Sequence, residues 1–143
     1  MRIALKQAKY AAARGEIPVG ALLVNQKGSI VAAHGNNCRQ AHDPTGHAEI
    51  RALRDAGQQL ENYRFPGTTM YVTLEPCAMC AAALVHARIE RIVFGATDAK
   101  AGALISKYSI GTDGRLNHSF SITQGVLEEE CRRILVHFFR KRR

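Results

Sequence analysis

Apolar residues along the chain fall into two kinds of segment, longer stretches with helical composition and short runs typical of buried strands. Residues 2–14 are rich in Ala and Lys and contain neither Gly nor Pro, which predicts a helix that ends at Gly15. Two apolar runs, at 19–24 and 29–33, flank a Lys-Gly turn at 27–28 and predict a β-hairpin. The chain is therefore expected to begin with a helix followed by two antiparallel strands.

The remaining chain alternates predicted strands and helices. We expect one helix capped by Thr45 that ends at Gly57, and another that begins at Pro76 and runs to about residue 86. The second of these is apolar on nearly every side, which predicts that it is buried. Further strands are expected at 70–74, 92–94 and 120–123, and a closing helix at 126–143. The alternation predicts an α/β fold, a three-layer α/β/α sandwich whose central mixed sheet has helices on both faces.

Length and composition limit the class of protein. The 143 residues contain no repeat and no linker rich in Pro, Gly and Ser, so we expect a single domain over 1–143. The charge of +8, from 20 Lys and Arg against 12 Asp and Glu, favours a polyanionic partner, either nucleic acid or an acidic membrane surface. No apolar stretch reaches the length of a membrane span and the first residues lack a secretory signal, which predicts no membrane insertion and a cytoplasmic location. In that reducing compartment the four cysteines are expected to be thiols or metal ligands rather than disulfides.

Candidate metal ligands occur in two short clusters, each at the start of a predicted helix. The first cluster is His47-Ala48-Glu49, and the second contains Cys77 and Cys80, three residues apart. Cysteines at this spacing can turn both sulfur atoms to one side of a helix, and with His47 they supply three ligands for Zn²⁺. Three protein ligands are typical of a catalytic zinc site, which keeps its fourth position for water. Glu49 can then lie beside the metal without binding it, and we interpret it as the catalytic proton shuttle.

Other interpretations of these residues are open from the sequence alone. A fourth ligand would close the site and make it structural, and the candidates are Cys131 or, from a polar loop, Cys38 and His42. Cys131 falls on the apolar stripe of the last predicted helix, where a thiol acts as a small hydrophobic side chain. The Cys-x-x-Cys spacing by itself would also suit a redox pair. The presence of both clusters at helix starts favours a catalytic zinc site over these alternatives.

The two clusters together form the signature H-x-E…P-C-x-x-C, which is known for zinc deaminases as a class. Four longer blocks extend the resemblance. They are Ile-Pro-Val-Gly-Ala at 17–21, DPTGHAEI at 43–50, YVTLEPC at 71–77 and VFGATDAK at 93–100. In this order the blocks resemble those of the bacterial tRNA-specific adenosine deaminases, a family within the zinc-dependent cytidine and deoxycytidylate deaminase superfamily.

The resemblance implies a function and a mechanism. The chain would adopt the cytidine deaminase-like fold, bind one Zn²⁺ per subunit and work as a homodimer. Its substrate would be the wobble adenosine in the anticodon stem-loop of a tRNA, which it would convert to inosine. Zinc-activated hydroxide would attack C6 of the base, and Glu49 would protonate N1 and then the departing amine, so that ammonia leaves.

The resemblance also assigns residues to substrate binding. Asn36 matches an asparagine that hydrogen-bonds the base, with its neighbour Asn37 as the alternative register. Ile17 would form an apolar wall of the base pocket, and Ala48 would act through its backbone. Asp98 matches a loop residue that contacts the RNA beside the target nucleotide.

The last predicted helix combines an apolar face with a basic end. Its Glu residues at the start and its Arg and Lys residues at the end would by themselves suit the helix dipole, without any RNA. An aromatic ring beside the basic cluster favours RNA binding, because unpaired bases stack on aromatic rings that alternate with Arg and Lys. The residues expected to bind RNA are Phe138, Phe139, Arg140, Lys141, Arg142 and Arg143.

Two competing functions share part of this pattern. A cytosine, guanine or nucleoside deaminase would have the same zinc ligands and the same Glu49, but no use for the basic C-terminus. A non-catalytic RNA-binding zinc module would use the metal and the basic surface, but would not depend on Glu49.

Overall fold

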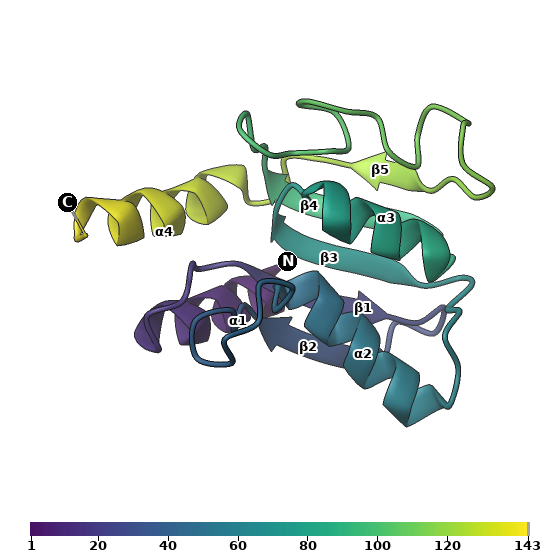
Figure 1. The fold of residues 1–143 in the computed structure, drawn as a ribbon, viewed down its shortest axis with the longest axis horizontal. Helices are drawn as coiled ribbons and strands as arrows, with labels where there is room; N and C mark the ends of the chain where they lie inside the picture. Colours follow the sequence, from purple (N-terminus) through teal and green to yellow (C-terminus); the bar gives the residue numbers. More distant parts are fainter. Residues whose placement is uncertain (143) are drawn as a thin grey trace.

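One mixed β-sheet runs through the computed structural model, which describes residues 1–142 (Figure 1). The strand order is β2-β1-β3-β4-β5. Strand β1 pairs antiparallel with β2 and β3, whereas β3, β4 and β5 are parallel to one another. In chain order the elements are α1 (Arg2–Ala13), β1 (Gly20–Val24), β2 (Ile30–Gly35), α2 (Ala48–Leu60), β3 (Thr69–Leu74), α3 (Ala78–His86), β4 (Arg91–Ala96), β5 (Ser121–Thr123) and α4 (Glu128–Arg140).

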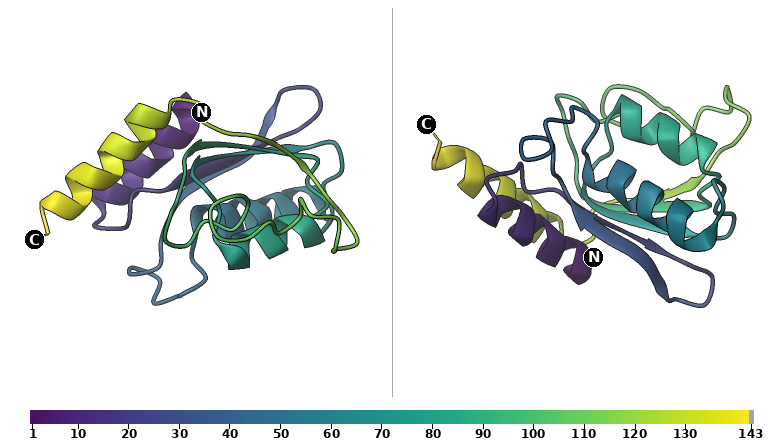
Figure 2. Two further views of the ribbon diagram at one scale, coloured as in Figure 1. Left: turned by 90° about the horizontal axis from the view of Figure 1, so that it is seen from above. Right: turned by 60° about the horizontal axis from the view of Figure 1, so that its bottom comes forward.

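Helices cover both faces of the sheet. Helices α2 and α3 lie on one face, and α1 and α4 lie side by side on the other (Figure 2). The main hydrophobic core fills the space between the sheet and the pair α2 and α3, with Leu84 and Phe94 fully buried in it. A smaller apolar cluster beneath α1 and α4 contains Leu5, Ala96 and Cys131. The predicted three-layer α/β/α sandwich is confirmed. None of the helices in residues 1–142 combines the length and the apolar character that a membrane crossing requires.

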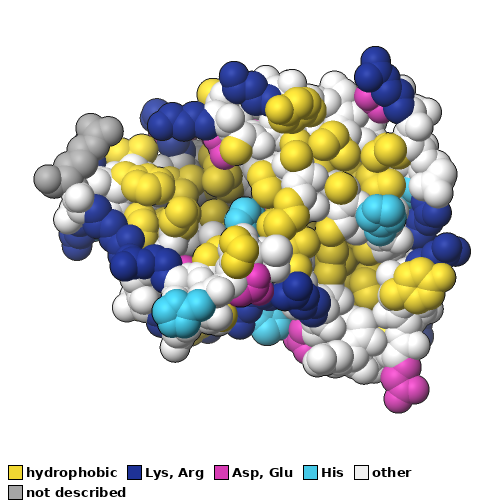
Figure 3. Space-filling model, in the orientation of Figure 1, with side chains coloured by type: hydrophobic (Ala, Val, Ile, Leu, Met, Phe, Trp, Pro, Cys, Tyr) yellow, Lys and Arg dark blue, Asp and Glu magenta, His cyan; other side chains and the backbone are white. Residues whose placement is uncertain are grey.

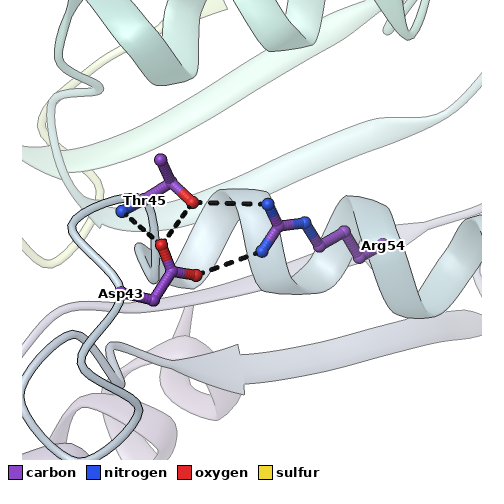
Figure 4. Close-up of polar contacts among 3 residues, drawn as sticks. All are labelled: Asp43, Thr45 and Arg54. Atoms are coloured by element: carbon purple, nitrogen blue, oxygen red, sulfur yellow. Dashed lines mark hydrogen bonds and ion pairs between the residues drawn. The ribbon is translucent and has the colours of Figure 1, made fainter.

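Helix α2 differs from its prediction at both ends. It begins at Ala48 with His47 as the N-cap residue, so Thr45 is not the cap. The Thr45 hydroxyl is instead engaged with Asp43 and Arg54 (Figure 4). The helix also continues through Gly57 and ends at Leu60, because the next residue adopts a left-handed conformation that breaks the helical path.

Helix α3 also differs from its prediction. It begins at Ala78, two residues after Pro76, and Cys77 is its extended N-cap residue. The expectation that this helix is buried on every side is wrong. Cys80 and Leu84 face the core, but Ala78 is exposed and Met79 is only partly covered. One side of an apolar helix therefore lies on the surface.

Two of the segments that carry predicted site residues follow β3 and β4. The two strands are parallel and in register, with Leu74 opposite Ala96, so the segments that follow them leave the same edge of the sheet. The amide of Glu75 donates to the Ala96 carbonyl at 2.8 Å and continues the pairing past the last strand residue. Carboxyl ends of adjacent parallel strands are the usual position of a site in such sheets.

Candidate active site

Two helix N-termini bring the predicted metal ligands together. His47 precedes α2, and Cys77 and Cys80 lie at the start of α3, on the same face of the sheet (Figure 1). The His47 Nδ1 atom is 3.6 Å from Cys77 Sγ and 3.5 Å from Cys80 Sγ. Tetrahedral bonding to one Zn²⁺ with ordinary Zn–S and Zn–N lengths puts such atoms about 3.6 Å apart. The donor set and its spacing therefore fit zinc.

The number of ligands is three. Among residues 1–142, His47, Cys77 and Cys80 form the single group of three or more potential metal ligands whose ligand atoms all lie within 4.8 Å of one another. Cys131 is fully buried in the apolar cluster beneath α4, and neither Cys38 nor His42 belongs to the group. The ligand count is that of an open zinc site rather than a closed structural one.

Hydrogen bonds hold the loop that carries His47. The Asp43 carboxylate accepts from the Thr45 amide at 2.8 Å and from the Thr45 hydroxyl at 2.7 Å (Figure 4). Arg54, in the middle of α2, donates to Asp43 and Thr45, at 3.3 Å each. The loop is thereby tied to the helix that it introduces, which restricts the position of the His47 ring.

The ligand atoms also polarise one another. The Cys80 thiol, as a hydrogen-bond donor, and His47 lower the pKa of Cys77 to about 4. The same hydrogen bond raises the pKa of Cys80, and the bond to Cys77 raises the pKa of His47. A cysteine whose lowered pKa favours the thiolate, next to an imidazole, is a combination of ligands that suits Zn²⁺.

Glu49 is buried beside the ligands without belonging to them. Its side chain is 3% exposed, and burial raises its pKa to about 6. Its Oε2 atom has no hydrogen-bond partner among the described residues. A carboxylate with a pKa near neutrality and a free oxygen can both accept and release a proton, which is the requirement for general acid–base catalysis at neutral pH.

A cavity of about 600 Å³ opens over these residues. Its floor contains His47, Glu49 and Cys77. The walls come from five segments: the loop after α1, the loop after β2, the end of β3, the loop after β4 and the C-terminal half of α4 with Arg142 just beyond it. The wall residues are Glu16, Ile17, Val19, Asn36, Cys38, Arg39, Leu74, Glu75, Asp98, Lys100, Ala101, Leu135, Phe138, Phe139 and Arg142.

The structure separates the two asparagine candidates. Asn36 lines the cavity, whereas Asn37 lines a different depression beside α2. The Ala48 amide donates to Asn36 Oδ1 at 2.8 Å, which leaves the Asn36 side-chain NH₂ group to face a ligand. Ala48 itself is fully buried and does not line the cavity. Its backbone amide binds the Asn36 side chain and so orients it, and the backbone role that the resemblance implies for Ala48 stays a prediction.

The other predicted substrate residues lie at the mouth of the cavity. Ile17 lines the wall as an exposed apolar side chain, 42% accessible. Asp98 is half-buried in the opposite loop, where its carboxylate also accepts from the amides of Lys100 and Ala101. Both positions agree with contacts to a ligand that enters from outside.

The predicted RNA-binding residues of the C-terminal segment are not equivalent. Phe138 is buried on the core side of α4, with the Arg142 guanidinium stacked 4.0 Å from the centre of its ring. Phe139 packs edge-on against Phe138 but is 47% exposed, and both rings line the cavity. Arg140 and Lys141 are exposed. Arg143 lies outside the described residues.

Two buried carboxylates at the cavity were not singled out from the sequence. Glu16 accepts from the backbone amides of Arg39 and Gln40, and Glu75 accepts from the loop after β4. Burial alone would raise the pKa of each carboxyl, but the hydrogen bonds outweigh burial and hold both pKa values below their usual range. No spacing rule marks either residue, because their partners lie more than 20 positions away.

Comparison with known proteins agrees with this geometry. Residues 1–96 match the model of the cytidine and deoxycytidylate deaminase zinc-binding region. The chain is 50% identical to a tRNA-specific adenosine deaminase of Haemophilus influenzae, over all of this chain and 83% of the relative. It is 43% identical to the Bacillus subtilis protein of the same name, over all of this chain and 88% of the relative.

Solved structures show the same fold. A structure described in a study of A-to-I editing by tRNA:A34 deaminases has a TM-score of 0.91 and 43% identity, covering 94% of this chain and 97% of the other. A guanine deaminase from Nitrosomonas europaea has a TM-score of 0.81, covering 94% and 80% of the two chains. Its identity of 21% shows a shared fold only.

Proposed function

The chain belongs to the tRNA-specific adenosine deaminases of the cytidine and deoxycytidylate deaminase family, and we propose how its cavity deaminates the wobble adenosine. The enzyme converts adenosine to inosine at position 34 of tRNA with zinc as cofactor. The observation that carries the mechanism is the buried Glu49 carboxylate, which lies in one cavity with His47, Cys77 and the base-facing Asn36.

Each residue of the floor has one part in the reaction. His47, Cys77 and Cys80 would hold the zinc, whose Lewis acidity would let water act as a nucleophile at neutral pH. Glu49 would take one proton from the attacking water and deliver it to N1 of the base, and would then carry the second proton, from the new hydroxyl at C6, to the departing amine. Water adds at C6, ammonia leaves, and inosine remains, so the reaction is a balanced hydrolysis.

The walls select and hold the base. The NH₂ group of Asn36 donates a hydrogen bond to an acceptor on the base, and Ile17 packs against its flat apolar face. An adenosine in an anticodon loop is unpaired, so it can turn out of the loop into the cavity at small unstacking cost. Asp98 at the mouth is the contact for the adjoining nucleotide. Because tRNA is the substrate, we place the enzyme in the cytoplasm.

The substrate class is tested by comparing an anticodon stem-loop with small molecules. We expect inosine to form in a stem-loop with adenosine at the wobble position, with much slower release of ammonia from free adenosine, cytidine or guanine. Mass spectrometry of the digested RNA measures the product. Rapid turnover of a free base with an unmodified stem-loop would identify the enzyme as a small-molecule deaminase that shares the fold.

The end of α4 extends the RNA surface beyond the cavity. Replacing Phe139 with Ala should weaken stem-loop binding by about 1 kcal/mol or more, because a base stacked on an aromatic ring contributes about 1–3 kcal/mol. Tyr10→Ala is the matched control, since Tyr10 is also 47% exposed and lies away from the cavity. Fluorescence anisotropy with labelled RNA gives both affinities. Equal stem-loop affinities of the two variants would show that Phe139 does not contact the RNA.

The uncovered side of α3 supports a homodimer. In the space-filling view hydrophobic side chains gather over α3 and between α3 and α2 (Figure 3). Leu53, Tyr63, Phe65 and Ala83 line an open groove there, and Tyr63 is 73% exposed. A contiguous apolar patch of this kind on a soluble domain is typical of a surface that another protein covers. A second copy of the chain is the occupant that the family resemblance implies.

A charge on this surface should prevent dimer formation. We expect Ala82→Glu, on the half-covered side of α3, to convert a dimer to a monomer, because dimerisation would bury the carboxylate without a partner. Ala13→Glu places the same charge on an exposed alanine of α1 and should leave the dimer intact. Light scattering after size exclusion measures both masses. A monomeric wild type, or a dimeric Ala82→Glu variant, would contradict this interface.

A further inference from the structure

The most heavily hydrogen-bonded carboxylate of the described chain is that of Glu75, which directly precedes the zinc-ligand segment. It is 2% exposed and accepts five hydrogen bonds, all from the loop at 97–106. Its Oε1 accepts from the amides of Leu104 at 3.2 Å, Ile105 at 2.9 Å and Ser106 at 3.0 Å. Its Oε2 accepts from the Asp98 amide at 3.0 Å and from the Ser106 hydroxyl. Oε1 thus binds only the far end of the loop, whereas Oε2 joins the Asp98 end to Ser106.

The same loop is also joined to the backbone of the zinc-ligand segment. Gly102 forms an isolated β-bridge with Cys77, and the Ala103 amide donates to the Pro76 carbonyl at 2.8 Å. A Cβ atom at Gly102 would lie 2.2 Å from Glu75 Oε2, so a side chain at this position would displace the carboxylate or the loop. Gly102 is therefore the residue that lets the loop approach Glu75.

The loop carries one side chain that the proposed function uses. Asp98 is the second residue of this loop. The hydrogen bond from the Asp98 amide to Glu75 Oε2 sets the direction of the loop backbone at the cavity mouth. The Asp98 carboxylate then closes the following turn by accepting from Lys100 and Ala101. A change at Glu75 would thus reach Asp98 directly, through one hydrogen bond.

We propose that Glu75 is a positioning residue, which ties the RNA-contacting loop with Asp98 to the segment that carries the zinc ligands. It does not touch the substrate. It keeps the distance between the mouth of the cavity and its floor constant, so that a nucleotide held at Asp98 has its neighbour over the zinc site. This inference rests on the proposed function of Asp98.

The isosteric substitution Glu75→Gln removes the hydrogen-bond acceptor at Oε2 and keeps the one at Oε1. In Glu75→Gln we expect the glutamine carbonyl oxygen to take the place of Oε1, because there it accepts from three backbone amides. The new NH₂ group then takes the place of Oε2 and faces the Asp98 amide. Two donors repel each other, whereas the Ser106 hydroxyl can rotate and accept. The substitution therefore releases Asp98 while the other end of the loop stays bound.

Steady-state kinetics on the anticodon stem-loop tests the inference. We expect Glu75→Gln to raise KM about 10-fold and to change kcat less than about 3-fold, because a contact made equally in ground and transition states affects KM alone. Zinc content should stay at the wild-type value. The decisive measurement is a double-mutant cycle with Asp98→Ala, in which Glu75→Gln should have no further effect on KM. Gly102→Ala, which forces the loop away from an intact carboxylate, should raise KM in the same way.

A matched control distinguishes positioning from general stabilisation. Glu16 is an equally buried carboxylate that holds backbone amides of the loop after β2, and Glu16→Gln should be additive with Asp98→Ala. Additive effects of Glu75→Gln and Asp98→Ala, or a fall in kcat at unchanged KM, would overturn the inference and leave the proposed function intact. An unchanged KM in Asp98→Ala would overturn the assignment of Asp98 to RNA and this inference with it. If Glu75→Gln does not fold, the cycle of Gly102→Ala with Asp98→Ala gives the same decision.

Discussion

Replacing Glu49 with Gln is expected to lower kcat on the anticodon stem-loop by about three orders of magnitude, because a positioned general acid–base group contributes about 10²- to 10⁴-fold. Glutamine has the size and shape of glutamate, but it cannot carry the proton from water to N1 and on to the amine. The substituted side chain occupies a site that is already almost closed to solvent, so little else changes. Single-turnover assays with saturating enzyme measure the chemical step directly.

Two further properties of the Glu49→Gln variant should be normal. Zinc stoichiometry stays at one per subunit, because Glu49 is not among the three ligands, and stem-loop affinity stays near the wild-type value. Asp55→Asn is the control on the same helix, since Asp55 pairs with His34 outside the cavity. We expect full activity from it. Turnover in Glu49→Gln close to the wild-type rate would contradict the shuttle and favour a non-catalytic zinc module.

Removing Cys80 should eliminate both zinc and activity. Two ligands remain in Cys80→Ala, and the third corner of the site becomes a buried methyl group that cannot bind a metal. A metal that binds only the folded state stabilises it by about 3 kcal/mol at 100 times its dissociation constant, so the variant should also unfold at a lower temperature. Metal analysis by mass spectrometry and thermal unfolding by circular dichroism measure the two effects.

The control for Cys80→Ala is the other buried cysteine. Cys131 has the same exposure, 0%, but packs in the apolar cluster beneath α4 with its sulfur away from the site. Cys131→Ala should lose stability through the cavity it creates, yet keep zinc and turnover. Chelation of wild-type zinc should reproduce the Cys80→Ala phenotype and be reversed by added zinc. Full zinc occupancy in Cys80→Ala, or zinc loss in Cys131→Ala, would mean that the ligand set is different.

The candidate metal ligands and proton shuttle could be predicted from the sequence, whereas the bounds of the helices could not. His47, Glu49, Cys77 and Cys80 were identified because each cluster spans one helical turn, and spacing within a turn is a local property. The limits of α2 were wrong because tertiary contacts decided them. Threonine is a residue type that often caps a helix. The Thr45 hydroxyl instead donates to Asp43 and accepts from Arg54, and the helix begins at Ala48.

The burial of α3 shows a different limit. A helix that is apolar on all sides indicates that each side is buried. The sequence does not show whether the same chain or another chain buries it. Within the described chain Leu84 is covered by the sheet, but Ala78 and Met79 are not. The proposed dimer would cover the side of α3 that the subunit's own core leaves on the surface.

The sequence alone predicted the types of metal-ligand residue, Glu49 as the candidate proton shuttle, and the alternation of strands and helices, because all of these depend on residues within a few positions of one another. Only the tertiary structure decided that one histidine and two cysteines converge, that Asn36 rather than Asn37 lines the cavity, and that Glu75 joins the loop at 97–106 to the segment that carries Cys77. These relations connect residues that are 12 to 33 positions apart. The register of β3 against β4 and the packing of α2 beside α3 create them, and no local pattern encodes either.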